Sequence, residues 1–258
     1  MRLVLPSRRG LIAGAAGLGA TALAGCDRLS ASPSFQHFIG ASEGLTMSAQ
    51  RLLLSGQPLA REFSPRDLSP VFKANGSTAP TDPAYQALAA GGFAGYRLGV
   101  SGLVRRPLQL RLADLKALPW RTQITRHDCV EGWSCIGAWT GVQLSRVLAI
   151  AGLQPRARFI VFHCADKLEP TTDESGRYYE SIDLFDAFHP QTILAWALDG
   201  RTLDIAHGAP LRLRVERQLG YKSAKFVMAI EAVDDLRPFG RGKGGFWEDR
   251  GYQWYAGI

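Results

Sequence analysis

Lysine, cysteine and methionine are scarce in this sequence of 258 residues, and long runs of one kind are missing. Lysine supplies only six of the 30 basic residues, and there are four cysteines and three methionines. The basic residues are dispersed without a run of five, and none of the standard binding motifs occurs, so nucleic acid is not an expected partner. No uncharged apolar run reaches the ~20 residues of a membrane span, which excludes a multispanning membrane protein.

The composition that remains is that of a folded protein. Hydrophobic residues make up 46% and aromatic residues 10%, which is enough for a sizeable core and unlike disordered or coiled-coil chains. The net charge of +7 comes mainly from arginine. This excess has two interpretations: a compositional bias of the genome, or recognition of anions, because a guanidinium group binds phosphate and sulfur oxyanions through two hydrogen bonds.

Residues 1–25 have the features of an export signal. Arg8 and Arg9 precede an uncharged stretch of alanine, glycine and leucine that is shorter than a membrane span and ends in small residues. Paired arginines before a weakly apolar region resemble a twin-arginine signal. That pathway exports proteins already folded, which is typical of proteins that receive their cofactor in the cytoplasm.

A cysteine follows the signal directly. Residues 23–26, Leu-Ala-Gly-Cys, have the form of a bacterial lipobox, in which Cys26 is lipidated and becomes the mature N-terminus. Ordinary cleavage near Ala24 is the alternative. We expect residues 26–49 to be an irregular Ser/Ala/Gly tether. The predicted location is the periplasm, with membrane contact at the outer face of the inner membrane through the lipid anchor if Cys26 is modified.

From residue 50 onward, strands outnumber helices without a regular βαβ alternation, so a mixed α+β fold is expected. No repeat and no long linker divides residues 50–258. Residues 240–245 contain Gly-Lys without a following Ser or Thr, which predicts a flexible surface loop and not a phosphate-binding loop. The expected strands are 96–100 and 108–111, paired as a hairpin, 121–126, 159–162, 193–198, 211–215 (edge-facing or half-buried, with alternating Leu and Arg) and 226–233. The expected helices are 112–118 and 142–150.

Three cysteines remain beyond Cys26, namely Cys129, Cys135 and Cys164. An odd number in an oxidising compartment leaves at least one thiol free or bound to a ligand. A disulfide between Cys135 and Cys164 is one alternative. Structural zinc is disfavoured, because the Cys129–Cys135 spacing is not that of a zinc pair and no Cys-x-x-Cys occurs.

The sequence around Cys129 resembles a known metal-ligand motif. Residues 126–134, Arg-His-Asp-Cys-Val-Glu-Gly-Trp-Ser, with Trp-Thr-Gly-Val-Gln-Leu at 139–144, are similar to the molybdenum-ligand motif of the sulfite oxidase superfamily. The closest likeness is to the branch of periplasmic methionine-sulfoxide reductase catalytic subunits. Further matches are His-Gly-Ala-Pro-Leu-Arg at 207–212, Leu-Gly-Tyr-Lys-Ser-Ala-Lys at 219–225, and the segment 245–252.

The resemblance implies a sulfite-oxidase type α+β fold over residues 50–258, with mixed sheets, short helices and bound molybdenum-molybdopterin. Cys129 is then both the metal ligand and the catalytic residue, because a thiolate is a soft, strongly donating ligand for a redox-active metal. Arg212 and Lys225 provide positive charge for the terminal phosphate of the pterin. The other implied cofactor-binding residues are Asn75, Cys164, His207, Ser223 and Ala224.

The implied reaction is two-electron oxygen-atom transfer, with reduction of an S- or N-oxide as the leading interpretation. The substrate is then a small molecule or a methionine-sulfoxide type group. The chain has no Cys-x-x-Cys-His haem motif, so electrons come from a separate haem or quinone-linked partner. Gly132 stands where those reductases carry alanine, and Arg126 would favour an anionic substrate if its side chain faced the pocket. Asp128, Glu131 and His163 are candidates for proton delivery.

Three other functions stay open at this point. A sulfite dehydrogenase would share the cofactor and reverse the direction of oxygen transfer. A non-catalytic envelope binding lipoprotein would need no metal and would tolerate serine at position 129. An iron or zinc hydrolase would contain metal without molybdenum.

Overall fold

The computed structural model describes residues 32–53 and 58–258. The chain divides into two compact units, Met1–Ser55 and Gly56–Ile258. The predicted signal peptide, and Cys26 with its predicted lipid anchor, lie outside the described residues. In the two described stretches, no helix is both long and apolar enough to cross a membrane.

The described part of the first unit is helix α2 (Pro33–Leu53). Proline is well tolerated at the start of a helix, and Arg51 in the last turn interacts favourably with the helix dipole. The irregular tether expected here is therefore wrong from residue 33 onward. Glycine and serine lower helix propensity by less than ~1 kcal/mol each, and the Ala, Leu, Gln, Glu and Met residues between them favour a helix.

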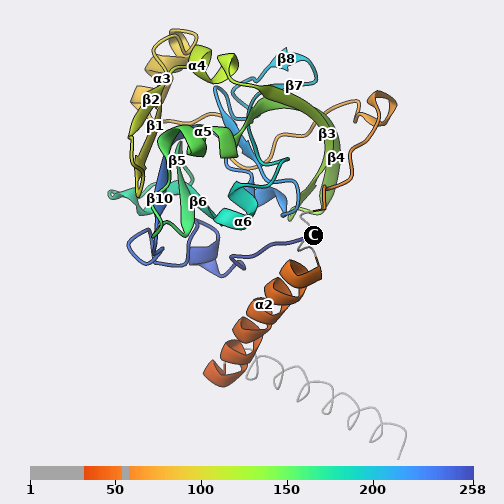
Figure 1. The fold of residues 1–258 in the computed structure, drawn as a ribbon, viewed down its shortest axis with the longest axis vertical. Coiled ribbons are helices and arrows are strands. Elements are labelled where there is room, and N and C mark those ends of the chain that lie inside the picture. Colours follow the sequence, from red (N-terminus) through yellow and green to blue (C-terminus); the bar gives the residue numbers. More distant parts are fainter. Residues whose placement is uncertain (1–31, 54–57) are drawn as a thin grey trace, which may run out of the picture. The chain divides into compact units, whose positions relative to one another are not determined.

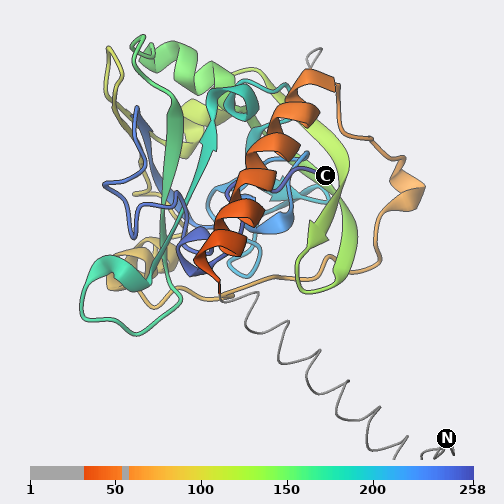
Figure 2. The ribbon, with the colours of Figure 1, turned by 90° about the horizontal axis from the view of Figure 1, so that it is seen from below.

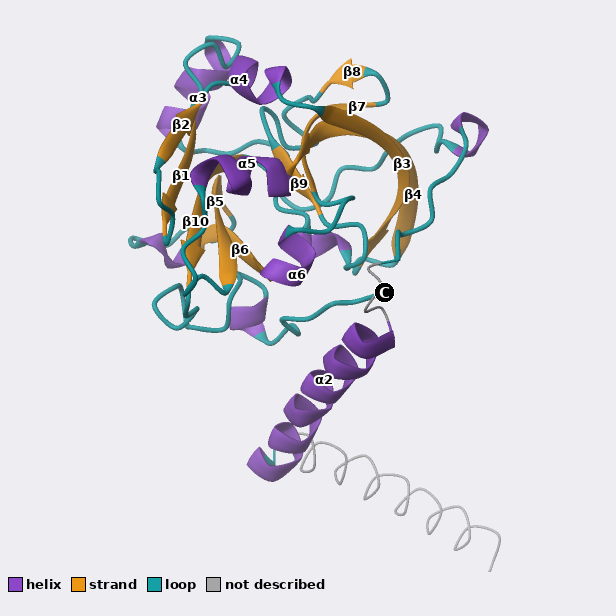
Figure 3. Cartoon of the chain, viewed as in Figure 1, coloured by secondary structure: helices purple, strands orange, loops and turns teal. Residues whose placement is uncertain are grey.

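Within residues 58–258, the second unit contains two sheets of five strands each (Figures 1 and 3). The first sheet has the strand order β2-β1-β10-β5-β6, in which only the β1–β10 pair is parallel. The connection between β5 and β6 extends beyond this sheet as a loop with a short helical turn, at the lower left of Figure 2. The strands of the first sheet are β1 (Leu98–Gly102), β2 (Leu108–Leu110), β5 (Phe159–Lys167), β6 (Arg177–Asp183) and β10 (Val227–Val233).

The second sheet has the order β3-β4-β7-β8, with β9 paired to β7. Strands β3 and β4 form a long curved hairpin that dominates one side of the unit (Figure 1). The strands of this sheet are β3 (Trp120–Cys129), β4 (Trp133–Gln143), β7 (Ile193–Leu198), β8 (Arg201–Thr202) and β9 (Arg212–Arg214).

The helices of this unit are short. Helix α5 follows β4 directly, buries its Leu144 and Leu148, and ends at Gly152, whose positive φ of 69° suits glycine. The α-helices are α3 (Pro83–Ala90), α4 (Leu112–Ala117), α5 (Leu144–Ala151) and α6 (Leu184–Ala187), and the 3₁₀ turns are η1 (Pro65–Asp67), η2 (Glu174–Gly176), η3 (Gly220–Lys222) and η4 (Glu248–Arg250).

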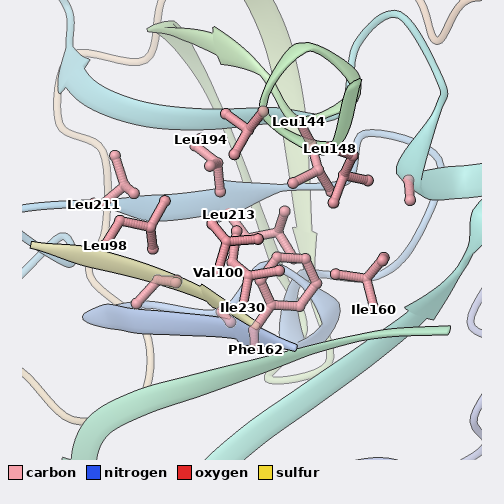
Figure 4. Close-up of a cluster of buried hydrophobic side chains, with 14 of the residues drawn as sticks. Leu98, Val100, Leu144, Leu148, Ile160, Phe162, Leu194, Leu211, Leu213 and Ile230 are labelled. Atoms are coloured by element: carbon pink, nitrogen blue, oxygen red, sulfur yellow. The ribbon is translucent and has the colours of Figure 1, made fainter. Parts of the chain in front are cut away.

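The main core lies between the two sheets (Figure 4). Side chains of the first sheet, among them Val100, Phe162 and Ile230, face those of β7, β9 and α5. All are fully or almost fully buried. This packing holds β9 and η3 against the end of β3, where the candidate site lies.

The mixed α+β class is confirmed, as are the β1–β2 hairpin and the helix that became α5. Strands β4 and β6 and helix α3 were not predicted. The strand expected at 211–215 is observed as β9, but its expected half-buried character is wrong, because Arg212 and Arg214 are both buried. Residues 240–245 are not simply a surface loop either, since Gly244 and Gly245 are buried.

Candidate active site

Cys129 lies at the end of the β3–β4 hairpin. The antiparallel register begins at Trp120–Val142 and ends with Cys129 opposite Trp133. The turn between the strands is closed by a hydrogen bond of 3.0 Å from the amide of Gly132 to the Cys129 carbonyl, and Gly132 has a φ of 84° that favours glycine. The hairpin therefore fixes the backbone of Cys129 while leaving its side chain half-buried.

The alternation of β3 decides which residues accompany Cys129. Side chains of a strand point alternately to opposite faces. Thr125 and His127 are buried on the inner face, which Cys129 continues, and Arg126 is exposed on the outer face. Arg126 is paired with Asp128 at 2.9 Å. The side chain of Arg126 therefore does not face the Cys129 pocket.

Cys129 lines a cavity of about 150 Å³. Of the predicted catalytic and cofactor-binding residues, four line this cavity: Asn75, Cys129, Ser223 and Lys225. Its remaining wall is formed by Gly76, Ser77, Val130, Glu131, Asp166, Leu168, Tyr178, Gly220, Tyr221, Trp247 and Tyr252. Burial raises the pKa of the Cys129 thiol, and the positive charges of Lys73 and Arg212 oppose this effect.

Arg212, on β9, does not line the cavity itself but contacts Asn75 of the cavity wall. Its guanidinium is completely buried and donates to the side-chain oxygen of Asn75 at 3.1 Å and to the carbonyl of His207 at 3.2 Å. It also lies over the ring of Trp139, 5.1 Å from the centroid. Its Nε has no hydrogen-bond partner among the described residues. Burial, reinforced by the nearby charge of Arg214, lowers the pKa of Arg212 to about 9.

Lys225 is a second buried cation in this region. Its ammonium group donates to the carbonyls of Asn75 at 2.6 Å and Ala206 at 2.9 Å, and also to that of Ser77. Burial and the charge of Arg212 lower its pKa to about 7. Within residues 32–53 and 58–258, neither cation has a carboxylate at ion-pair distance.

The donor set fits an anionic cofactor. Burying a charge is unfavourable unless an opposite charge compensates it, and the hydrogen-bond partners of Arg212 and Lys225 are all neutral oxygens. The phosphate and the two sulfur atoms of molybdopterin would supply the missing negative charge. Ser223 lines the cavity, although its hydroxyl oxygen accepts the amide of Val215 at 3.3 Å.

Besides Arg212, three predicted cofactor-binding residues do not line the cavity. Cys164 is buried in the main core, and its thiol contacts the Phe162 carbonyl. His207 borders a separate groove of about 600 Å³ and contacts the Phe72 carbonyl at 2.8 Å, although its own carbonyl holds Arg212. Ala224 is buried, and its carbonyl accepts the amide of Leu213. Across the described chain Cys135 and Cys164 are free, without the alternative disulfide.

Asp166 was missed by the sequence interpretation. This residue of β5 lines the cavity, and its carboxylate accepts the Ser77 hydroxyl at 2.8 Å. The other carboxylate oxygen lacks a partner in the described part of the chain, and burial raises the pKa of the group. The sequence signal that could have identified Asp166 was an aspartate at the end of an apolar strand. A bulge between His163 and Lys167 changes the register there and could not be predicted.

The candidates for proton delivery separate in space. Glu131 lines the cavity and accepts the indole N–H of Trp133 at 3.0 Å. Asp128 is bound to Arg126 on the outer face of β3, and His163 pairs with Glu231 at 2.9 Å on the first sheet, away from Cys129. Among the described residues, no group of three or more His, Cys, Asp or Glu side chains could hold a metal ion.

Comparison with known proteins identifies the class of this site. The family model of the oxidoreductase molybdopterin binding domain matches residues 87–238. The chain therefore belongs to this family, within the sulfite oxidase superfamily, and its cofactor is molybdopterin. The predicted oxidoreductase class and α+β fold are confirmed.

Similar proteins are named as subunits of protein-methionine-sulfoxide reductases. YedZ1 of Azospira oryzae, provisionally named a protein-methionine-sulfoxide reductase subunit, is 38% identical over 202 residues, which are 76% of this chain and 70% of that protein. The protein-methionine-sulfoxide reductase catalytic subunits MsrP of Campylobacter jejuni and Ralstonia nicotianae are 33% and 36% identical, over 53% and 55% of this chain. The matches cover 48% and 45% of those proteins, so the chain spans about half the length of these MsrP relatives.

A solved structure is also similar. The sulfane dehydrogenase SoxCD from Paracoccus pantotrophus is 25% identical, with a TM-score of 0.49, and the match covers 55% of this chain and 39% of that chain.

Proposed function

We propose that this protein reduces an S-oxide, with a methionine-sulfoxide type substrate, at a molybdenum bound by Cys129. When bound, the molybdenum-pterin supplies a metal that takes up or releases an oxygen atom together with two electrons. In the overall reaction the S–O bond breaks, two electrons and two protons are consumed, and the oxygen leaves as water. Arg212 and Lys225 hold the anionic end of the pterin, with Asn75 and Ser223 beside them.

The observation that carries the substrate class is the charge around Cys129. The next two residues in the cavity wall are Val130 and Glu131, one apolar and one acidic. Arg126, the arginine closest in sequence, is exposed on the opposite face of β3. This arrangement favours a neutral S-oxide over an anion such as sulfite.

The aromatic wall of the cavity supports a sulfur substrate. Tyr252 packs edge-on against Tyr221 at 5.2 Å and stacks with Trp247 at 5.4 Å, and all three line the cavity. Aromatic rings make favourable contacts with sulfur, worth ~0.3–1.5 kcal/mol each. The names of the relatives also support a sulfoxide substrate.

The proposal includes an envelope location and a separate electron donor. The twin-arginine type signal at residues 1–25 supports export of the loaded protein, and Cys26 supports a lipid anchor in the periplasm. The absence of a haem-attachment motif from the sequence supports delivery of electrons by a haem or quinone-linked partner.

The first test is the molybdenum content of protein from a molybdate-fed host, with Cys129→Ser and the control Cys135→Ser in parallel. We expect nearly one molybdenum per chain in the wild type and the control, and little in Cys129→Ser. The loaded protein is then given methionine sulfoxide with a reduced viologen dye, or sulfite with a chemical oxidant. Metal-free wild type would contradict the cofactor site, and turnover of sulfite alone would favour the dehydrogenase.

A further inference from the structure

His127 occupies the position next to Cys129 on the inner face of β3. Residues two apart on a strand share a face, and their Cα atoms are separated by about 6–7 Å. The imidazole is 2% exposed and packs between the rings of Phe72 and Trp133, at centroid distances of 5.8 and 5.7 Å. The cofactor-binding residues inferred from the motif did not include it.

Arg214 fixes the tautomer of this histidine. Its guanidinium nitrogen lies 2.7 Å from Nδ1 of His127. Because arginine only donates hydrogen bonds, Nδ1 must accept, and the proton of the neutral ring is on Nε2. Arg214 is held in turn by two hydrogen bonds to Glu216, at 3.0 and 2.6 Å, and Glu216 also accepts Gln123 at 2.8 Å. The whole network is buried.

The N–H at Nε2 has no partner among the residues that the structure describes. A buried donor left unpaired costs ~1–3 kcal/mol. The ring edge that carries it lies against Gly220, a residue of the cavity wall. A Cβ at position 220 would be 2.4 Å from both Nε2 and Cε1, so only glycine leaves room for the ring edge at this wall.

We propose that Nε2–H of His127 donates a hydrogen bond to the sulfur ligands around the molybdenum, and that Arg214 and Glu216 are positioning residues that hold the ring in this tautomer. The inference rests on the proposed function, in which Cys129 binds the metal. Such a donor withdraws electron density from a sulfur ligand and raises the reduction potential of the metal.

Two substitutions separate the nitrogen atoms of the ring. In His127→Asn the amide oxygen stands near the position of Nδ1 and can still accept Arg214, but the donor at Nε2 is lost. In His127→Gln the amide N–H reaches the position of Nε2, and the acceptor for Arg214 is lost. Thr125→Val is a matched control, because Thr125 is on the same inner face and its buried hydroxyl also lacks a partner within the described chain.

The experiment measures molybdenum content and the midpoint potential of the loaded protein in a redox titration followed by electron paramagnetic resonance. We expect His127→Asn to lower the midpoint potential by about 59 mV, which corresponds to a tenfold change in the one-electron redox equilibrium. His127→Gln and Thr125→Val should stay near the wild-type value. Loss of molybdenum from His127→Asn, with His127→Gln still loaded, would support the same conclusion.

The proposal is overturned if His127→Asn is fully loaded and has the wild-type potential, or if Thr125→Val shifts the potential equally. Loss of molybdenum from both His127 variants would also overturn it, because the ring would then have only a packing role. A wild type without molybdenum is a different result, since it removes the proposed function itself.

Discussion

The chain buries two pairs of cations, Arg212 with Arg214 and Lys222 with Lys225. The two members of each pair are close in sequence but have opposite surroundings. On β9, Arg214 is bound by Glu216, whereas the hydrogen-bond partners of Arg212, two residues earlier, are neutral oxygens. In the segment that follows, Lys222 lies between two glutamates, whereas Lys225 contacts three carbonyls. One member of each pair is neutralised by the chain itself.

The pKa shifts of the two lysines follow this difference. The carboxylates of Glu180 and Glu248, at 2.5 and 2.6 Å, outweigh burial and raise the pKa of Lys222. At Lys225, burial and the charge of Arg212 outweigh the more distant carboxylates of Asp166, Asp204 and Glu131 and lower the pKa to about 7. A buried cation with its own counter-ion cannot be removed without leaving that counter-ion uncompensated, and a buried cation without one is suited to bind an anion from outside.

The largest predicted effect is the loss of stability on replacing Lys222, the lysine that is paired with two glutamates. Lys222→Met leaves Glu180 and Glu248 buried without a cation. Breaking a buried ion pair from one side costs about 3–5 kcal/mol. We expect this loss in the free energy of unfolding of the cofactor-free protein, measured with urea. A variant as stable as the wild type would show that the three groups contribute little to the fold.

Lys225→Met should weaken cofactor binding more than it changes folding stability. The cofactor-free protein should change by about 1 kcal/mol or less, because the lost hydrogen bonds are offset by relief of a buried charge. Cofactor binding should weaken by about 10- to 100-fold, the value of a charge-assisted hydrogen bond. Pterin and molybdenum retained after dialysis measure this change. Equal destabilisation by Lys225→Met and Lys222→Met would erase the distinction between the two lysines.

The pH dependence of folding stability tests the difference between Lys222 and Lys225 without substituting either lysine. The pKa of Lys225 is about 7 in the folded chain, against ~10.4 in an unfolded chain. Between these values the unfolded chain binds the proton and the folded chain does not, so the stability of the cofactor-free protein should rise with pH. Below pH 7 both states hold the proton, and this contribution stays constant.

Urea midpoints at pH 6, 7, 8 and 9 test this dependence in wild type and Lys225→Met. The difference between the two proteins should change with pH above 7 and stay constant below it. A difference that is independent of pH throughout would contradict a lowered pKa at Lys225.

The smallest effect is expected on the outer face of β3. Arg126 and Asp128 form an exposed ion pair, with 56% of the Arg126 side chain accessible. Such pairs contribute ~0–1 kcal/mol. Arg126→Ala should therefore leave stability, molybdenum content and the rate of sulfoxide reduction nearly unchanged. A large change in turnover of an anionic substrate would place this arginine at the pocket after all.

Local pattern explains which elements could be predicted. The β1–β2 hairpin and helix α5 have regular spacing of apolar residues and clear ends, such as Gly152. Strand β4 contains glycine and polar residues within its span and was missed, although it carries half of the hairpin that presents Cys129. The Leu/Arg alternation of β9 predicted one exposed face, because charged residues are seldom fully buried.

The sequence by itself determined the family, the molybdopterin cofactor and several of the segments that form the cavity, because these depend on short motifs such as Cys-Val-Glu-Gly-Trp-Ser. Tertiary structure decided which of the similar cations are compensated. Glu180 is 42 residues from Lys222, and Asn75 is 137 residues from Arg212. Tertiary structure also placed the unpaired N–H of His127 against Gly220, a residue of the cavity wall. The energy of a buried charge depends on the groups within a few ångströms, and the fold brings those groups from distant parts of the chain.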